Sequence, residues 1–185
     1  MAASQVNRDA VERALGLIRM FPESASGFGT LRAMRPDELP APYRELLDHR
    51  SHMTVAMERL HGPVRLEVVD RGEDSAGRYA REILLVRADG RVVQHGIVRI
   101  DLRRLVAETA AAIRAAAIPL GRILIEAGLL RDVHDVSLLQ IDPGPHLRRL
   151  FGTDAAPAYG RVATIDLDGV PTVELLEIVA PGSVA

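Results

Sequence analysis

The sequence predicts an α+β domain with a single antiparallel β-sheet and helices on one side. Two hairpins and the segment between them carry this prediction. Residues 78–100, "RYAREILLVRADGRVVQHGIVRI", form two apolar strands around "ADG", and residues 161–181 form a second pair that turns at Asp168-Gly169. Between the hairpins, residues 102–117 and 119–128 have the composition of helices, the first of them rich in alanine. Helices packed against antiparallel strands define the α+β class.

The segment before these hairpins is expected to hold a helix and a surface strap. Apolar residues recur at helical spacing over 6–20, and 21–30 has the composition of a loop. Three prolines between Pro36 and Pro42 indicate a chain draped over a surface, followed by a short helix near 42–50. This stretch is too short for a winged DNA-binding domain.

The rest of the chain is expected to alternate strands with short helices. Gly62-Pro63 marks a turn, so 52–62 ("HMTVAMERLHG") and 63–71 ("PVRLEVVDR") are predicted strands on either side of it. A further strand is predicted over 132–142 and a helix over 143–152 that closes at its final glycine. We therefore expect one domain over 1–185, with the helix and strap in 1–45 and the core in 46–181.

Composition narrows the chemistry. The chain has 185 residues, a formal charge of −2 and no apolar run long enough to cross a membrane, so neither nucleic acid nor a bilayer is the expected partner. The N-terminus lacks the apolar stretch of a signal peptide, which predicts a cytoplasmic protein. There is no cysteine, and all 23 basic residues are arginine. Thiolate nucleophiles, disulfides and lysine Schiff bases are therefore excluded.

Arg81 stands near the start of the first apolar strand. A guanidinium buried in a sheet costs several kcal/mol unless it meets an anion. With a three-residue tip, Arg81 would face Ile97 and share an apolar face with His95 and Arg99. A two-residue turn would move Arg99 to the other face, so this expectation depends on the register.

Two glutamates in the last strand are expected to point in opposite directions. Glu174 and Glu177 are separated by an odd number of residues, so in a regular strand one faces the interior and the other faces solvent. A buried carboxylate needs a partner, as a buried arginine does.

Four stretches together resemble the chorismate pyruvate-lyase (4-hydroxybenzoate synthase) family. They are "SHMTVAMERLHGPVRLEVV", "YAREILLVRADG…GIVRI", "PLGRILIEAG" and "VPTVELLEIVAP", in order over roughly 45–181. The resemblance implies an antiparallel sheet with helices on one side and an internal ligand cavity. It also implies an enzyme without metal or organic cofactor that converts chorismate to 4-hydroxybenzoate and pyruvate.

The resemblance also implies the site. Arg81 matches the arginine that binds the ring carboxylate, and Glu177, four residues before Pro181, matches the glutamate that meets the product hydroxyl. These two are the predicted catalytic residues. Backbone groups of Met53 and Leu120 match the remaining product contacts.

One position departs from the family pattern. The family's second arginine in the paired strand is Ile97 here, following His95-Gly96. Arg99 lies two residues further on and can project from the same face, and Arg122 is a second candidate for the enolpyruvyl carboxylate. His95, beside Arg81 in the predicted register, is a further ligand contact. Whether Arg99 replaces the missing cation is left open by the sequence.

The sequence is also compatible with two other functions and contains several potential metal ligands. One alternative is a related enzyme acting on another aromatic or enolpyruvyl acid. The other is a non-catalytic module that binds an aromatic acid, because the effector domains of some bacterial transcription regulators are similar to this fold. His49 and His52, with Asp48 and His95, form a possible zinc set, but a further ligand is missing and no metal site is predicted. A small aromatic carboxylate is the expected partner, and the oligomeric state is left open.

Overall fold

The computed structural model describes residues 2–154 and 157–184. Its centre is one antiparallel sheet of seven strands in the order β1-β5-β6-β7-β4-β3-β2. The strands are β1 (Gly29–Met34), β2 (Val64–Glu73), β3 (Tyr79–Arg87), β4 (Val92–Ile100), β5 (Arg131–Pro143), β6 (Ala158–Leu167) and β7 (Val170–Val179). Both predicted hairpins are present, as β3–β4 and β6–β7, and β4 pairs with β7 to join them at the middle of the sheet.

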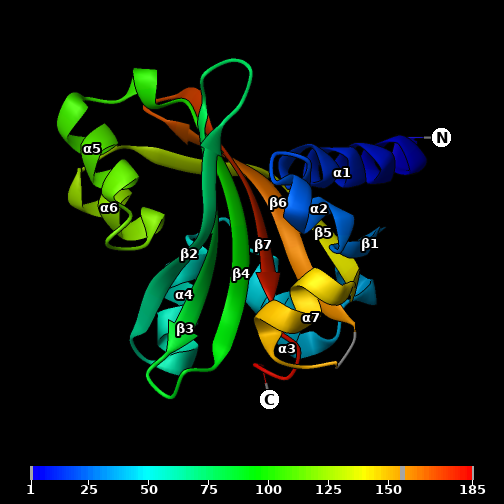
Figure 1. Ribbon diagram of the computed structural model, residues 1–185. Helices are drawn as coiled ribbons and strands as arrows, with labels where there is room; N and C mark the ends of the chain where they lie inside the picture. The colour runs from blue at the N-terminus through cyan, green and yellow to red at the C-terminus, as the bar shows by residue number, and fades with distance from the viewer. Residues whose placement is uncertain (1, 155–156, 185) are drawn as a thin grey trace.

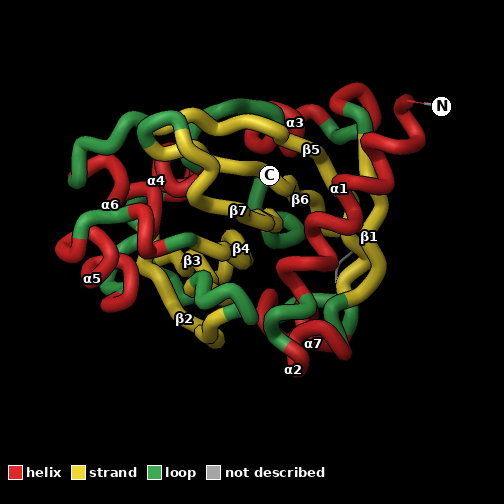
Figure 2. The backbone as a smooth tube through the Cα atoms, turned by 90° about the horizontal axis from the view of Figure 1, so that it is seen from above, coloured by secondary structure: helices red, strands yellow, loops and turns green. Residues whose placement is uncertain are grey.

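Helices cover both faces of this sheet (Figure 1). The helices are α1 (Ala2–Ile18), α2 (Pro22–Ser26), α3 (Ala41–Leu47), α4 (Met53–His61), α5 (Ala107–Ala115), α6 (Leu120–Glu126) and α7 (Pro145–Phe151), with short 3-10 turns at Pro36–Glu38 and Leu102–Arg104. On the face that carries Ile83 and Val98, the core is shared with α3 and α4 at one end and with α5 and α6 at the other. On the face that carries Ile97, the core is shared with α1, α2 and α7. Figure 2 shows α4, α5 and α6 grouped at one end of the molecule and α1 at the other.

The predicted α+β class with a single antiparallel sheet is confirmed. The structure differs in placing helices against two faces rather than on one side only. The reason lies in the burial of β3, in which eight of nine residues are buried, so side chains on both faces of that strand need apolar cover.

The β3–β4 hairpin departs from the predicted register. The tip has the expected three-residue form, since the amide N of Arg87 donates to the carbonyl O of Arg91. Directly after it, a β-bulge lets the strand β4 gain one residue, so that Val86 lies opposite Val92 but Leu85 lies opposite Gln94. Arg81 consequently faces Val98 instead of Ile97.

The bulge exchanges the two faces of β4 relative to β3. Gln94, Gly96 and Val98 share the face of Arg81, whereas His95 and Arg99 lie on the opposite face. The prediction that His95 and Arg99 share a face with Arg81 is therefore wrong. A single additional residue is enough because side chains alternate along a strand.

Two local predictions also differ from the structure. Residues 53–61 form the helix α4 and not a strand, with Met53 and Met57 buried four residues apart on one side of it. The segment predicted as a loop and strap contains the edge strand β1, which pairs with β5. The helix α7 ends at Gly152, as predicted, and the φ of 66° at this residue is the left-handed conformation that glycine favours.

None of the described helices has both the length and the apolar character needed to cross a bilayer.

Candidate functional site

A small, partly open cavity lies between the β3–β4–β7 part of the sheet and the beginnings of α4 and α6. Its volume is about 50 Å³. It is lined by His52, Met53, Thr54, Leu66, Arg81, Ile83, Leu85, Gln94, Gly96, Val98, Pro119, Leu120, Gly121, Ile165, Leu175 and Glu177. Four predicted site residues therefore meet around one cavity, namely Arg81, Glu177, Met53 and Leu120. Most of the remaining lining is apolar.

Arg81 is a buried cation that donates a hydrogen bond to the protein backbone. Its residue is 1% exposed, and Nη1 donates to the carbonyl O of Ile113 over 3.1 Å. Its Nε has no hydrogen-bond partner among the described residues, and none of the described acidic side chains forms an ion pair with it. Burial lowers the pKa of Arg81 because it disfavours the charged form. The neighbouring Tyr79 acts to raise this pKa, and the positive charge of Arg71 on β2 acts to lower it further. The guanidinium is thus held in the protein without a carboxylate.

Glu177 is neutralised by an arginine that the sequence analysis did not single out. Arg161 on β6 lies opposite Glu177 on β7, and its Nε donates to Oε2 of Glu177 over 2.8 Å. The side chains are 1% and 13% exposed, respectively. Burial raises the pKa of Glu177, while Arg161 and a hydrogen bond with Gln94 act in the opposite direction.

Arg161 also fastens the loop that leads into α4. Nη1 donates to the carbonyl O of His49 over 2.7 Å and to that of Leu47 over 3.4 Å, and Nη2 donates to the carbonyl O of Ser51 over 3.0 Å. Burial is the main cause that lowers the pKa of His49, and the positive charge of Arg161 is the second cause. One guanidinium therefore links Glu177 at the cavity to the residues just before α4.

The beginnings of α4 and α6 touch at the cavity. A Cβ added to Gly121 would lie 3.2 Å from Cβ of His52, so glycine permits this close approach. Farther along the two helices, Nη2 of Arg122 forms an ion pair with Glu58 at 2.7 Å. This pairing takes Arg122 away from the role of second carboxylate binder.

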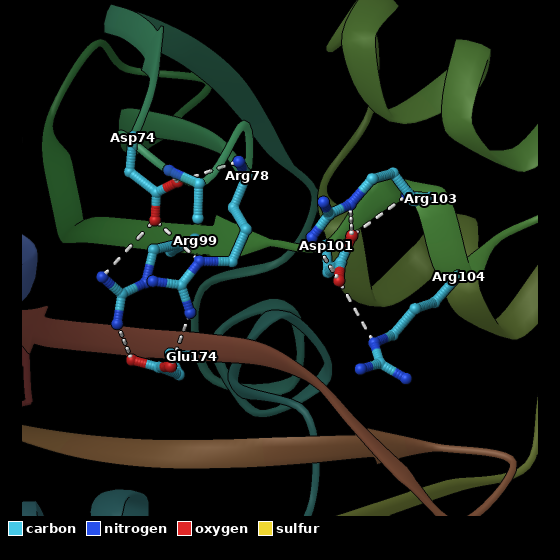
Figure 3. Close-up of polar contacts among 8 residues, drawn as sticks. Asp74, Arg78, Arg99, Asp101, Arg103, Arg104 and Glu174 are labelled. Carbon is cyan, nitrogen blue, oxygen red and sulfur yellow. Dashed lines mark hydrogen bonds and ion pairs between the residues drawn. The ribbon is translucent and has the colours of Figure 1, made fainter.

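Arg99, the other candidate for that role, lies on the opposite face of the sheet. It forms an ion pair with Glu174, and its Nη1 lies 3.7 Å from Oδ2 of Asp74 (Figure 3). Nε of Arg78 donates to the same aspartate over 2.7 Å. The prediction that Glu174 and Glu177 point to opposite faces is confirmed, since Glu174 belongs to this partly exposed network and Glu177 to the cavity.

His95 is likewise absent from the cavity and belongs to a buried cluster behind the sheet. Its Nε2 lies 2.7 Å from Oε1 of Glu82, and Nε2 of His146 on α7 lies 2.8 Å from the same oxygen. Oγ of Ser24 on α2 donates to the other oxygen, Oε2. Burial by itself would raise the pKa of Glu82, but the interactions with His95, Ser24 and His146 outweigh it and lower that pKa to about 2.

The histidine set considered for zinc is not assembled. His52 lines the cavity and His49 contacts Arg161 next to it, and burial is the main cause that lowers the pKa of each. His95 lies behind the sheet.

Comparison with known proteins gives structural likeness alone. A scan against family models and a search of curated protein sequences each find no match. Among solved structures, a protein from Streptomyces coelicolor assigned as a transcriptional regulator superposes with a TM-score of 0.52 at 14% identity, over 66% of this chain and 90% of that one. This likeness shows a shared fold.

Two further structures fall just below that level of similarity. One is the ligand-binding domain of a GntR-family transcriptional regulator from Bordetella bronchiseptica, with a TM-score of 0.49 and 13% identity over 64% of this chain and 86% of that one. The other is the C-terminal domain of the histidine utilization repressor from Pseudomonas syringae, with a TM-score of 0.48 and 14% identity over 66% of this chain and 94% of that one.

These findings overturn the predicted chorismate pyruvate-lyase. A solved structure that superposes with a TM-score above 0.5 is that of a transcriptional regulator, so the expected lyase activity and its products are not supported. The geometry agrees with this correction. Chorismate carries two carboxylates, but Arg99 and Arg122 are both committed to carboxylates of the protein outside the cavity.

Proposed function

We propose that this chain is a non-catalytic module that binds a small aromatic carboxylate, comparable to the effector domain of a transcriptional regulator. The observation that carries the proposal is the guanidinium of Arg81, buried at the cavity without an acidic partner among the described residues. A buried cation left unpaired is unfavourable by several kcal/mol. A ligand carboxylate reaching Nε and the adjacent Nη would remove that cost and add charge-assisted hydrogen bonds.

The charges around the cavity favour a monoanion. Arg161 neutralises Glu177, so Arg81 is left as the uncompensated charge among the described charged lining residues. A second carboxylate on the ligand would approach Glu177 instead of a cation. Glu177 and Gln94 provide polar atoms for a hydroxyl group at the far end of such a ligand.

The apolar lining suits a ring between these two ends. Ile83 and Leu85 on β3, Val98 on β4 and Leu175 on β7 surround the middle of the cavity. At about 50 Å³ the cavity is smaller than the ~150 Å³ in which benzene is known to bind inside a protein. Binding therefore requires α4 or α6 to move outward, and both helices touch the ligand space through their first residues, Met53 and Leu120.

The test is a thermal melt with 4-hydroxybenzoate and, as a neutral analogue of similar shape, 4-hydroxybenzamide. We expect the acid to raise the melting temperature and the amide to have little effect. At one hundred times the dissociation constant the acid adds about 2.7 kcal/mol of stability. Arg81→Met removes the effect, and Arg65→Met, at an exposed position on β2, keeps it.

The proposal fails if the acid and the amide stabilise the protein equally, or if Arg81→Met still responds to the acid. It also fails if neither 4-hydroxybenzoate nor benzoate changes the melting temperature.

A further inference from the structure

Behind the sheet, on the face opposite the cavity, three potential metal ligands converge from three different elements. Glu82 lies on β3, His95 on β4 and His146 on α7. All three residues are buried, and one ligand atom from each lies within 4.8 Å of the others. We propose that this Glu82–His95–His146 cluster is a binding site for a divalent transition-metal ion such as Zn²⁺.

The direction of the imidazoles supports this assignment. Both rings present Nε2 to the same carboxylate oxygen, Oε1 of Glu82, at 2.7 and 2.8 Å. Two nitrogens and one oxygen thus surround a single point, the donor set that zinc accepts from histidine and glutamate. Oγ of Ser24, which contacts Oε2 of the same carboxylate, places a further oxygen at the cluster. A small expansion to nitrogen–metal distances of about 2.0–2.1 Å gives room for the ion.

The charge of Glu82 is the second argument. Its side chain is 0% exposed, and no arginine among the described residues forms an ion pair with it. The carboxylate oxygens are in contact with Ser24 and the two imidazoles, but none of the described arginines brings a permanent positive charge to them. A divalent ion would place two positive charges beside this ionised carboxylate in the interior of the protein, where electrostatic attraction is least screened.

The surroundings of the His95 and His146 rings determine how strongly the cluster is expected to bind a metal ion. A metal-bound histidine normally donates its second ring N–H to an acceptor. Nδ1 of His95 has no hydrogen-bond partner among the described residues, and Nδ1 of His146 lies 3.1 Å from Nη2 of Arg149, which is a donor. Arg149 therefore keeps the proton of His146 on Nε2, the atom that the metal needs. We expect micromolar affinity, because missing partners of this kind cost ten- to a hundredfold.

Arg149 gives the proposal a distinctive consequence. It is exposed, so its side chain can turn into solvent when His146 moves its proton to Nδ1. Arg149→Ala removes the competing donor outright and should tighten metal binding severalfold, although it lies outside the ligand set.

The experiment is a calorimetric titration of the chelator-treated 185-residue chain with ZnCl₂, followed by absorption spectra with Co²⁺. The expected result is one ion per chain, at least tenfold weaker binding in His146→Gln, and stronger binding in Arg149→Ala. His61→Gln, a histidine at the end of α4 and outside the cluster, is the matched control and should bind as the unmodified chain does.

Absence of stoichiometric binding, or equal affinity in His146→Gln, overturns the proposal. So does an unchanged affinity in Arg149→Ala, a surface change that leaves the fold intact and remains informative if His146→Gln fails to fold. Circular dichroism of each variant verifies folding before the titration.

Discussion

Arg161 on β6 and Glu177 on β7 lie directly opposite each other, and their side chains form a largely buried ion pair beside the cavity. The same guanidinium holds three backbone carbonyls of the 47–51 loop. The pair therefore joins the sheet, the cavity and the entrance to α4 through one side chain, and removal of either partner should affect all three.

Glu177→Gln is expected to destabilise the protein by about 3 kcal/mol, because it leaves the charge of Arg161 buried without a counter-ion. Urea unfolding followed by circular dichroism measures the change. Glu67→Gln, which breaks the exposed pair with Arg65, is the matched control and should cost less than about 1 kcal/mol. Equal losses in the two variants would show that Arg161 is as well solvated as a surface arginine.

Arg81 and Arg161 should respond in opposite ways to the same substitution. Arg81→Met removes a buried cation that has no acidic partner among the described residues, so stability should be unchanged or higher. Arg161→Met leaves Glu177 and the loop carbonyls without their donor, and stability should fall by several kcal/mol. The urea concentrations at the unfolding midpoints of Arg81→Met and Arg161→Met, each compared with that of the unmodified protein, measure these changes in stability. A large loss in Arg81→Met would mean that Arg81 serves the fold and not a ligand.

Gly160 and Gly16 form a second contrasting pair. A Cβ on Gly160 would lie 2.4 Å from the carbonyl O of Glu177, whereas a Cβ on Gly16 in α1 meets nothing within 4 Å. Gly160→Ala should therefore disturb the β6–β7 contact and lower the melting temperature. Gly16→Ala should stabilise the helix by about 0.5–1 kcal/mol. Melting curves that show no difference between the two variants would contradict the close strand approach.

The pH dependence of stability should reveal Glu82. Its pKa is about 2 in the folded protein against 4.5 as the ordinary value, so its ionised form stabilises the fold. That contribution is complete above about pH 4.5 and is lost as the pH falls toward 2, on the order of 3 kcal/mol in total. Glu82→Gln should remove this part of the pH dependence in urea unfolding with a chelator present. Parallel curves of unfolding free energy against pH for the unmodified protein and Glu82→Gln would refute this role of Glu82.

The sequence predicted the antiparallel sheet, both hairpins and the three-residue tip at residues 88–90, because turn chemistry and alternation are local signals. The family resemblance, and not a local signal, implied that Arg81 and Glu177 belong to one site, and both line the same cavity. Sequence-based prediction failed at positions set by β-bulges. The bulge after Val92 places His95 and Arg99 on the face of the sheet opposite Arg81. The sequence contains no turn residue that would predict this bulge.

A β-bulge also explains why the sequence analysis did not single out Arg161. The two-residue turn at Asp168-Gly169 pairs Leu167 with Val170, and a regular ladder from there would set Arg161 opposite Leu176. A bulge near Pro171 shifts the register by one, so Arg161 meets Glu177 instead. The misreading of 52–62 as a strand has a different origin. Its β-branched residues and the following Gly-Pro resemble a strand and turn, but Met53 and Met57 are buried at helical spacing.

The central claim is tested most directly by a crystal structure of the protein with bound 4-hydroxybenzoate. The account predicts the carboxylate within hydrogen-bond distance of Nε and an Nη atom of Arg81, and the hydroxyl near Glu177. Arg161 keeps its bonds to Glu177 and to the loop before α4. A ligand bound outside this cavity, or bound with its carboxylate turned away from Arg81, would contradict the account.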